Sequence, residues 1–438
     1  MSDIEITRSV EIPDGLAAQN LCRKLPPGFP IFSDTETGQV LHESTLFLSR
    51  RLLGRFETGH LLVTAATVSA LAYDHRDFLR FLIKEQKAVE RLAAKDLYDY
   101  AATMTMRPSP ITGDQYAQGT VARRVRLAVE FAAWLCERGI GIETDRAAIL
   151  DLANRLPVNT HLRGNMRGYR RSAHVRSTLL PMQSKDHEPT ILTQEQVQIL
   201  LSQLSLPSRP ESEVEQALAK RNCLMAKLAL CAGLRREEVC NVSLGSIAAI
   251  VITSSEKRLM PLRLTKTKNS RIRNVLVPAP FVLALQQFVN VERKALVPAG
   301  IKNPQSLKEP LFPPLRRSRK GQVRPMTTQN FSLVVRQACL RAGLVTRVPA
   351  QAAGKRVELV TKPAFSIHDL RHTYAVWTYL LLRSSGDPNP WLYLQAQLGH
   401  RSSQTTIDVY LRAVRLFEVA VSDKFLNFAT EIIGWTEQ

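Results

Sequence analysis

The sequence predicts a mainly α-helical protein of more than one domain, with a small antiparallel sheet. Its 438 residues exceed what one hydrophobic core usually serves, so at least two domains are expected. Apolar residues recur at three- and four-residue spacings through much of the chain, which is the period of an amphipathic helix. Three short β-type segments, 247–253, 259–267 and 271–277, predict the sheet, and Asn269-Ser270 suits a hairpin turn.

The N-terminal part divides into two regions. Residues 1–60 contain Pro and Gly without a sustained period, which indicates an arm or appended segment. Residues 61–150 have a helical pattern and predict a compact helical domain. One of its helices carries Arg123 and Arg124 and should stop at Gly139, because glycine commonly ends a helix.

Residues 151–188 predict a basic linker. The stretch 152–184 holds six arginines and no acidic residue, and its Pro and Gly residues interrupt any long helix. An unbalanced positive segment suits contact with a phosphate backbone, although such a segment is also commonly a solvated connector. The arginines that we assign to DNA contact, in the linker and in the helix before it, are Arg123, Arg124, Arg163, Arg167, Arg170, Arg171 and Arg176.

Residues 189–438 predict a second, larger domain. Thr193 and Gln196 have the spacing of a helix N-cap and its capping-box partner. The inserts 299–327 and 344–364 fit either added DNA contacts or solvated loops. The apolar last helix must bury its face, on a neighbouring subunit or on the chain's own core. Helices are expected at 281–297, 329–342, 369–382, 390–398, 404–412 and 416–433.

The charge balance indicates a polyanionic partner. Lys and Arg number 59 and Asp and Glu 39, which gives a net charge of +20 and a pI near 10.0. Such a surplus in a folded protein favours nucleic acid, because phosphate neutralisation drives sequence-independent affinity. A membrane is disfavoured, since the chain has no run of about 18 apolar residues. The six cysteines form no C-x-x-C pair, which is typical of reduced, buried thiols.

The C-terminal domain contains an ordered set of side chains that suits attack on a phosphodiester without a metal. Two arginines can each fork onto the non-bridging oxygens of a phosphate. Histidines and a lysine can move protons, and a phenol can form the covalent bond. In chain order the set is Arg235, Lys266, His368, Arg371, His400 and Tyr410.

This set resembles the active site of the tyrosine recombinase, or phage integrase, family. The resemblance covers residues 189–438 well, through the Gly-Leu-Arg, His-x-x-Arg and Leu-Gly-His motifs, and covers the N-terminal half only in outline. Arg401, inside the Leu-Gly-His-Arg-Ser-Ser box, is a mild departure from the family pattern. The resemblance implies a helical core-binding domain and a mostly helical catalytic domain that close around DNA as a clamp.

The resemblance assigns the phosphate clamp to two arginines. Arg235 would be the first, supported by Glu238 three residues later on the same helical face. Arg236 is a competing candidate, but the spacing to Glu238 favours Arg235. Arg371 would be the second arginine of the clamp.

The resemblance also assigns the proton carriers and the nucleophile. His368 would accept or donate a proton beside the nucleophile, and His400 would hydrogen-bond the scissile phosphate. Tyr410, ten residues after His400, would be the nucleophile. His372, next to Arg371, is expected to pack or to support its neighbours.

A lysine on the predicted hairpin would protonate the departing 5′ oxygen. Lys266 fits the Thr-Lys-Thr form of many integrases. Lys268 fits an alternative spacing of five residues to Arg273. We favour Lys266 and keep Lys268 as the alternative.

The function implied by the resemblance is site-specific recombination or integration of DNA through a 3′-phosphotyrosine intermediate. No cofactor or metal is expected, because the energy of the broken bond is held in the phosphotyrosine. The N-terminal segment and the basic inserts favour a mobile-element integrase over a Xer-like resolvase. A type IB topoisomerase and a catalytically inactive DNA-binding regulator are further alternatives.

The expected partners are double-stranded DNA and further copies of the chain. Self-association as a tetramer on DNA would use the C-terminal helix. No membrane partner is expected, and a cytoplasmic, nucleoid-associated location follows from these expectations.

Overall fold

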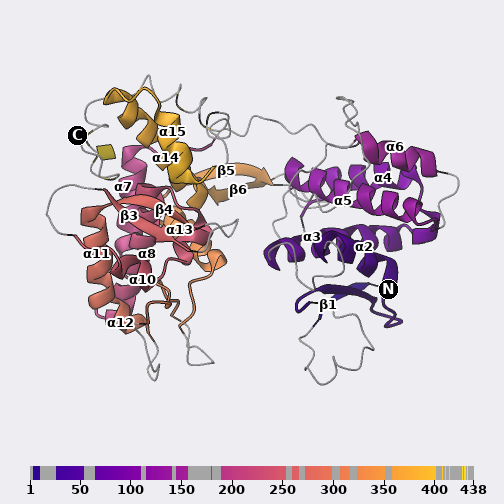
Figure 1. The fold of residues 1–438 in the computed structure, drawn as a ribbon, viewed down its shortest axis with the longest axis horizontal. Helices are drawn as coiled ribbons and strands as arrows, with labels where there is room; N and C mark the ends of the chain where they lie inside the picture. Colours follow the sequence, from indigo (N-terminus) through magenta and orange to yellow (C-terminus); the bar gives the residue numbers. More distant parts are fainter. Residues whose placement is uncertain are drawn as a thin grey trace. The chain divides into compact units, whose positions relative to one another are not determined.

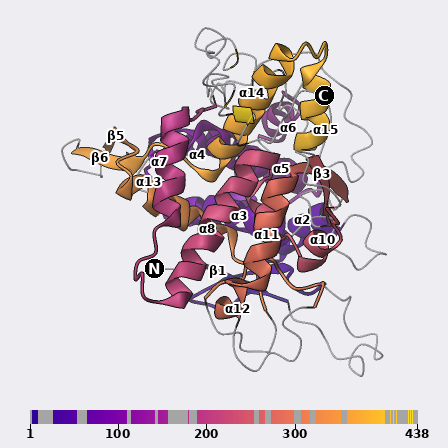
Figure 2. The same ribbon diagram turned by 90° about the vertical axis from the view of Figure 1, so that its left-hand side faces the viewer.

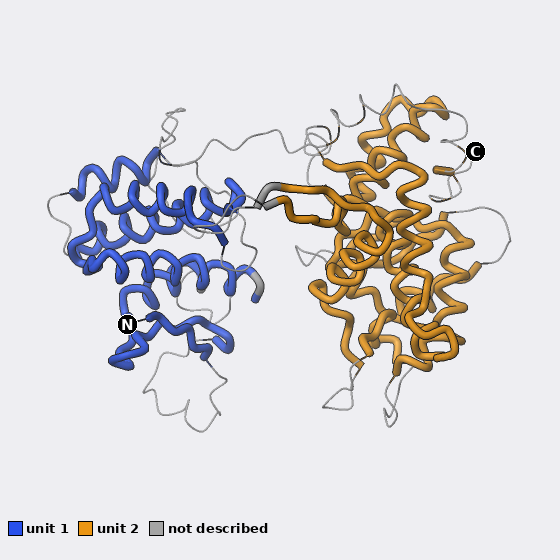
Figure 3. Tube along the Cα trace, turned by 180° about the vertical axis from the view of Figure 1, so that it is seen from behind, with its two compact units in different colours: residues 1–185, 350–357 blue, residues 186–349, 358–438 orange. Residues whose placement is uncertain are grey.

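The described part of the chain forms two compact, mainly helical units, in agreement with the predicted fold class. Unit 1 takes residues 1–185 and 350–357, and unit 2 takes residues 186–349 and 358–438 (Figure 3). The residues that the computed structural model describes are 3–9, 26–53, 65–109, 115–140, 145–155, 179, 189–252, 259–265, 272–297, 306–315, 323–350, 358–400 and positions 407, 410, 414, 427, 429, 430 and 432.

Unit 1 combines a small antiparallel sheet with a group of helices (Figure 1). In the sheet, Ile4 lies opposite Asp34 and Arg8 lies opposite Pro30. The elements are β1 (Ile4–Arg8), β2 (Pro30–Asp34), α2 (His42–Leu53), α3 (Ala65–Lys84), the 3-10 turn η1 (Val89–Arg91), α4 (Ala94–Met106), α5 (Gln118–Glu137) and α6 (Arg146–Arg155).

Aromatic residues from the first 60 positions belong to the core of unit 1. Phe29 and Phe32 are fully buried and Phe47 is nearly so, in one cluster with the apolar faces of α3 and α5. Aromatic side chains bury large areas, so a few of them anchor a segment that shows no apolar period. The structure therefore differs here from the arm or appended segment that the sequence suggests.

Helix α5 is buried over most of its length, including Val125, Phe131 and Leu135. It ends at Glu137, and Gly139 follows with a φ of +70°. A left-handed residue after the last turn is most readily a glycine, because a side chain is disfavoured in that conformation. The predicted stop at Gly139 is confirmed.

Unit 2 is built around helix α8, which contacts α7, α14 and β4. Figure 2 shows α7, α8 and α14. Its elements are α7 (Gln194–Ser205), α8 (Glu213–Ala232), α9 (Arg236–Cys240), α10 (Leu244–Ala248), β3 (Leu259–Leu264), β4 (Arg273–Pro278), α11 (Ala279–Asn290), α12 (Arg293–Leu296), α13 (Thr328–Arg341), β5 (Val345–Ala350), β6 (Glu358–Pro363), α14 (Ile367–Ser384) and α15 (Pro390–Leu398).

The predicted capping box at the start of α7 is confirmed. The Thr193 hydroxyl accepts from the backbone N–H of Gln196 at 3.3 Å. The Gln196 side-chain oxygen accepts in turn from the backbone N–H of Thr193 at 2.9 Å. These two bonds satisfy backbone donors that the first helical turn leaves free.

Two of the three predicted β segments form the hairpin of β3 and β4. The strands are antiparallel, with Leu264 opposite Arg273 at the described end of the hairpin. The predicted strand 247–253 is wrong where it overlaps helix α10. The Ser243 hydroxyl caps that helix by accepting from the Ser246 backbone N–H at 3.3 Å, and such a cap favours helix where a short apolar run alone leaves the choice open.

Both inserts contribute ordered structure. Leu311 and Phe312, from the insert 299–327, are fully buried in the core of unit 2. The insert 344–364 supplies β5 and β6, which pair in a two-stranded sheet. Among the described helices, none is long and apolar enough to cross a membrane.

Candidate active site

The first predicted motif lies at the junction of α8 and α9. Gly233 ends α8 with a φ of +62°, and a Cβ there would lie 2.5 Å from the ring of Tyr374. Glycine is thus required both by the turn and by the close approach of α14. The chain then reverses, and Arg235 occupies the N-cap position of α9.

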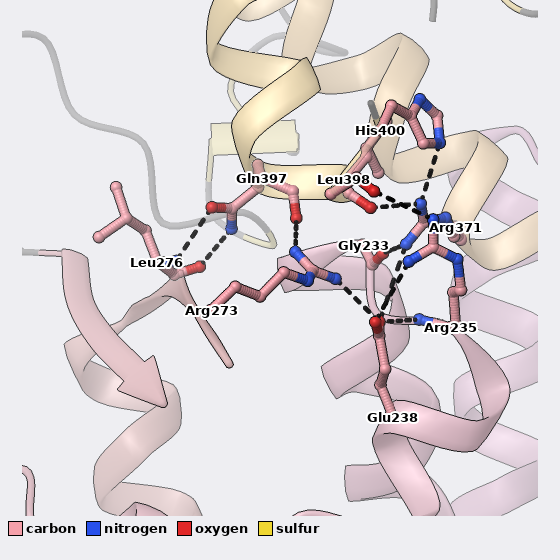
Figure 4. A network of polar contacts seen from close by, with 10 residues as sticks. Gly233, Arg235, Glu238, Arg273, Leu276, Arg371, Gln397, Leu398 and His400 are labelled. Atoms are coloured by element: carbon pink, nitrogen blue, oxygen red, sulfur yellow. Dashed lines mark hydrogen bonds and ion pairs between the residues drawn. The ribbon is translucent and has the colours of Figure 1, made fainter. Parts of the chain in front are cut away.

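Glu238 gathers the arginines of the site (Figure 4). One of its oxygens accepts from Nη1 of Arg235 at 3.2 Å. The other accepts from the Arg235 backbone N–H at 2.9 Å and from Nη2 of Arg273 at 2.9 Å. Nη1 of Arg371 lies 4.0 Å from that oxygen. The Glu238 side chain is 1% exposed, so a single buried carboxylate balances several guanidinium groups in a medium that screens charge weakly.

Arg371 is held by backbone carbonyls at two turns of the chain. It donates to Gly233 O, at the end of α8, and to Leu398 O at 2.8 Å, at the end of α15. Burial, and next the charge of Arg235, lower the pKa of Arg371 to about 10. The guanidinium therefore stays charged at neutral pH although the side chain is almost fully buried.

His400 follows the turn that ends α15. Gly399 has a φ of +63°, and a Cβ there would lie 2.9 Å from Nε of Arg273. Nε2 of His400 accepts from Nη2 of Arg371 at 3.1 Å. Burial, followed by the charges of Arg371 and Arg235, lowers the pKa of His400 to about 4. At neutral pH this histidine is neutral.

Tyr410 is helical, and its side chain is buried against the same site. Its hydroxyl lies 3.0 Å from Nδ1 of His372, and the two rings meet edge to face with centroids 5.4 Å apart. Burial raises the pKa of Tyr410, and the charge and a hydrogen bond of Arg371 oppose that rise. The Tyr410 hydroxyl thus interacts with Arg371 of the same chain.

The histidine that contacts Tyr410 differs from the expected one. The resemblance places His368 beside the nucleophile, but the hydroxyl contacts Nδ1 of His372, one helical turn later on α14. The rings of His368 and His372 have centroids 6.0 Å apart. Burial lowers the pKa of His368, and the charge of Arg371 lowers it further. In the sequence, His372 directly follows Arg371, and this adjacency is the signal that could have pointed to His372 as a residue of the site.

Arg273 is a second residue to which the sequence gave no site role. Besides its bond to Glu238, it donates through Nη1 to the backbone oxygen of Gln397. The Gln397 side chain accepts from the Leu276 N–H at 3.0 Å and donates to Leu276 O at 2.7 Å. Strand β4 is therefore tied to the end of α15, directly before His400 (Figure 4).

Several predicted residues lie outside the described part or have structural partners. Lys266 and Lys268 lie outside it. Nε of Arg123 lies 2.8 Å from a carboxylate oxygen of Asp74, and Nε of Arg124 lies 3.2 Å from the other. Arg123 is about half exposed, so its DNA contact stays a prediction, whereas Arg124 is mostly buried. The predicted DNA-contacting arginines that also lie outside the described residues are Arg163, Arg167, Arg170, Arg171 and Arg176.

In the described part of the chain, no group of three or more His, Cys, Asp or Glu side chains is arranged to hold a metal ion. The described cysteines, Cys136, Cys223, Cys231, Cys240 and Cys339, are buried and unpaired with one another.

The sequence of residues 190–415 matches the phage integrase family. The match spans slightly more than half of the 438 residues and includes Arg235, Arg371, His400 and Tyr410. The chain belongs to this family, which is that of the tyrosine recombinases.

Three solved structures illustrate the proteins that the chain is similar to. The XerH site-specific recombinase bound to palindromic difH substrate is 18% identical, with a TM-score of 0.47 over 88% of this chain and 85% of that one. The Tn1549 transposon integrase with transposon right-end DNA is 15% identical, with a TM-score of 0.45 over 86% and 99%. Lambda integrase bound to DNA is 14% identical, with a TM-score of 0.41 over 84% and 96%. A comparison with curated proteins found no match.

Proposed function

We propose that this family member is a site-specific DNA recombinase that breaks and rejoins DNA through a 3′-phosphotyrosine intermediate. The observation that carries the proposal is the position of the Tyr410 hydroxyl. The guanidinium of Arg371 hydrogen-bonds both to this hydroxyl and to Nε2 of His400. A phenol placed beside a buried arginine cluster suits in-line attack on a phosphate held by that cluster.

The arginines supply the electrostatic part of the reaction. Attack on a phosphodiester builds negative charge on the non-bridging oxygens, and guanidinium groups fork onto such oxygens. Arg235 and Arg371 are already oriented by Glu238 and by backbone carbonyls, so little reorganisation is needed when the charge develops. His400, neutral and bonded to Arg371, can contribute a hydrogen bond to the same phosphate.

The leaving group and the rejoining step complete the reaction. Cleavage frees a 5′ hydroxyl, which needs a proton as it departs, and Lys266, in the sequence between β3 and β4, is the proposed donor. The bond energy is kept in the phosphotyrosine, so a 5′ hydroxyl from a partner strand can reverse the step without ATP or a metal. We propose that Tyr410 acts in cis, on the phosphate bound by its own chain.

The biological role proposed is integration or excision of a mobile element. The inserts 299–327 and 344–364, which carry core residues and the β5–β6 hairpin, support an elaborated integrase over a compact Xer-like resolvase. Strand exchange would require self-association on DNA, proposed as a tetramer. An inactive regulator is disfavoured by the complete set of arginines, histidines and tyrosine, and a type IB topoisomerase would relax a plasmid that lacks target sites.

The proposal is tested with a nicked DNA substrate that traps the covalent intermediate. The natural chain should give a protein-linked DNA band on a denaturing gel, with the DNA attached through its 3′ phosphate. Arg235→Ala and Arg371→Ala should each lower the cleavage rate by about a hundredfold or more while DNA binding persists. Attachment through a 5′ phosphate, or unchanged cleavage in either variant, would refute the proposed mechanism.

A further inference from the structure

We propose that His372 is a catalytic residue of this reaction and takes the proton from the Tyr410 hydroxyl when the tyrosine attacks phosphorus. The inference rests on the proposed function and names a base for its first step. His372 contacts the attacking oxygen itself, with Nδ1 and the hydroxyl oxygen 3.0 Å apart. That separation lies within hydrogen-bond reach, which is the geometric requirement for a general base.

The phenol needs a base because of where it lies. Tyr410 is 1% exposed, so water has almost no access to its hydroxyl. Burial raises the pKa of this phenol above its ordinary value of about 10 despite the nearby charge of Arg371. At neutral pH the hydroxyl therefore keeps its proton, and attack requires a neighbouring group that can receive it.

Three other side chains of the site, those of Arg371, His400 and Glu238, are unsuited to receive that proton. Arg371 has donors and no acceptor. His400 already uses Nε2 to accept from Arg371 at 3.1 Å. Glu238 is engaged by Arg235 and Arg273 through both of its oxygens. Nδ1 of His372 lies 3.0 Å from the hydroxyl oxygen and accepts from the phenol when the imidazole carries its hydrogen on Nε2.

Helix α14 explains how one short motif serves both the phosphate and the nucleophile. Arg371 and His372 are consecutive, so their side chains leave the helix about 100° apart. Arg371 reaches the carbonyls at the ends of α8 and α15. His372 reaches Tyr410, with Nδ1 3.0 Å from the hydroxyl oxygen and the two rings edge to face.

The step balances in atoms and charge. As the bond from the Tyr410 oxygen to phosphorus forms, the phenolic proton passes to Nδ1 and His372 becomes an imidazolium. The bond from phosphorus to the 5′ oxygen breaks, and that oxygen takes a proton from the hairpin lysine. Rejoining reverses both transfers, so His372 returns its proton to Tyr410 and emerges unchanged.

The inference is tested first by replacing His372 and then by making the Tyr410 phenol more acidic, so that it attacks with less help from a base. His372→Phe keeps a ring and removes both nitrogens, so single-turnover cleavage on the nicked substrate should slow by roughly a hundredfold or more. A ring-fluorinated tyrosine at position 410 has a more acidic phenol and can attack with less help from a base. In the His372→Phe background, that replacement should recover most of the lost rate.

Two controls separate the base from its alternatives. A 5′-bridging phosphorothioate substrate removes the need for a leaving-group proton, so it should not rescue His372→Phe. His372→Asn can place an oxygen near the Nδ1 position and preserve packing, and it should also be slow and be rescued by the fluorinated tyrosine. The Asn variant keeps the test valid if the Phe variant loses its fold or its DNA binding.

The outcomes distinguish this inference from the proposed function. If the natural chain forms the covalent adduct and the His372 variants cleave at its rate or faster, the base assignment is wrong and the proposed function stands. Slow variants that fluorination does not rescue would assign His372 to packing and equally overturn it. If the natural chain forms no adduct on any substrate, the proposed function itself fails.

Discussion

At the scale of single residues, Glu238 controls the charge balance of the site. It is nearly fully buried and contacts Arg235 and Arg273, with Arg371 at 4.0 Å. Glu238→Gln keeps the shape and removes the negative charge, which leaves buried cations uncompensated. We expect unfolding to become easier by about 3–5 kcal/mol and cleavage to fall sharply. Urea unfolding and the single-turnover cleavage assay measure the two effects.

The adjacent Glu237→Gln provides the matched control. Glu237 is exposed on the same short helix, so its loss of charge should change stability by no more than about 0.5 kcal/mol. Equal behaviour of the two variants would show that Glu238 does not balance the arginines.

His75 makes a separate prediction about the stability of unit 1. It is fully buried among Phe32, Phe47 and Phe131, and neither ring nitrogen has a hydrogen-bond partner. Burial, and next the charge of Arg51, lower the pKa of His75 to about 3 in the folded chain. The folded state thus favours neutral His75, so stability is complete above the unfolded pKa of about 6.5 and is lost as pH falls below it, by about 2 kcal/mol at pH 5.

This pH dependence is measured by urea unfolding at pH 7 and pH 5. His75→Phe should reduce the loss of stability between those two values, because the group that binds a proton on unfolding is gone. His42→Gln, at an exposed histidine, controls for the removal of a histidine. An identical loss in the natural chain and in His75→Phe would contradict the account.

At the scale of elements, the β3–β4 hairpin is coupled to the turn that carries His400. Arg273 and Gln397 join β4 to the end of α15, and Lys266 follows Leu264, the last residue of β3, by two positions. We predict that Lys266→Ala slows cleavage strongly and that a 5′-bridging phosphorothioate restores it, since sulfur leaves without a proton. If the phosphorothioate instead restores cleavage by Lys268→Ala and not by Lys266→Ala, Lys268 is the residue that protonates the leaving 5′ oxygen.

Signals local in sequence identify the side chains that the structure brings together here. Arg235, Arg371, His400 and Tyr410 lie in short motifs of fixed order, and their catalytic roles stay predictions. Capping and turn chemistry likewise placed Gly139 and Thr193. These features depend on neighbours a few residues away, so the sequence carries them directly.

Contacts between distant segments were not predictable in the same way. Arg273 and Gln397 are 124 positions apart, and their contact exists only after β4 and α15 pack together. The resemblance predicts that His372 packs or supports its neighbours, whereas its contact with the Tyr410 hydroxyl depends on where the helical segment of Tyr410 docks. Helix α10 was missed since five apolar and small residues fit a strand as well as a helix.

At the scale of the whole molecule, the question is whether the C-terminal segment packs on the core of its own chain. The predicted last helix was left open between docking on a neighbouring subunit and packing in cis. Ala429 is fully buried in the core cluster of unit 2, and Ile432 packs against that cluster. In cis packing, Ala429→Asp buries a charge, so the free protein should lose about 3 kcal/mol or more of stability.

Thermal unfolding without DNA, at a protein concentration where the chain is monomeric, measures this effect. Asn427→Asp is the matched control because Asn427 is exposed on the same segment. If Ala429→Asp leaves thermal stability unchanged and impairs only assembly on DNA, the segment docks on another subunit.

The central claim is that Tyr410 of this chain becomes covalently attached to DNA. The direct measurement is mass spectrometry of the peptide that remains on DNA after the trapped complex is digested with a protease and a nuclease. We predict a nucleotide attached to Tyr410 through a 3′ phosphate in the natural chain, and no adduct in Tyr410→Phe, which should still fold and bind DNA. An adduct on another residue, or one that persists in Tyr410→Phe, would contradict the mechanism.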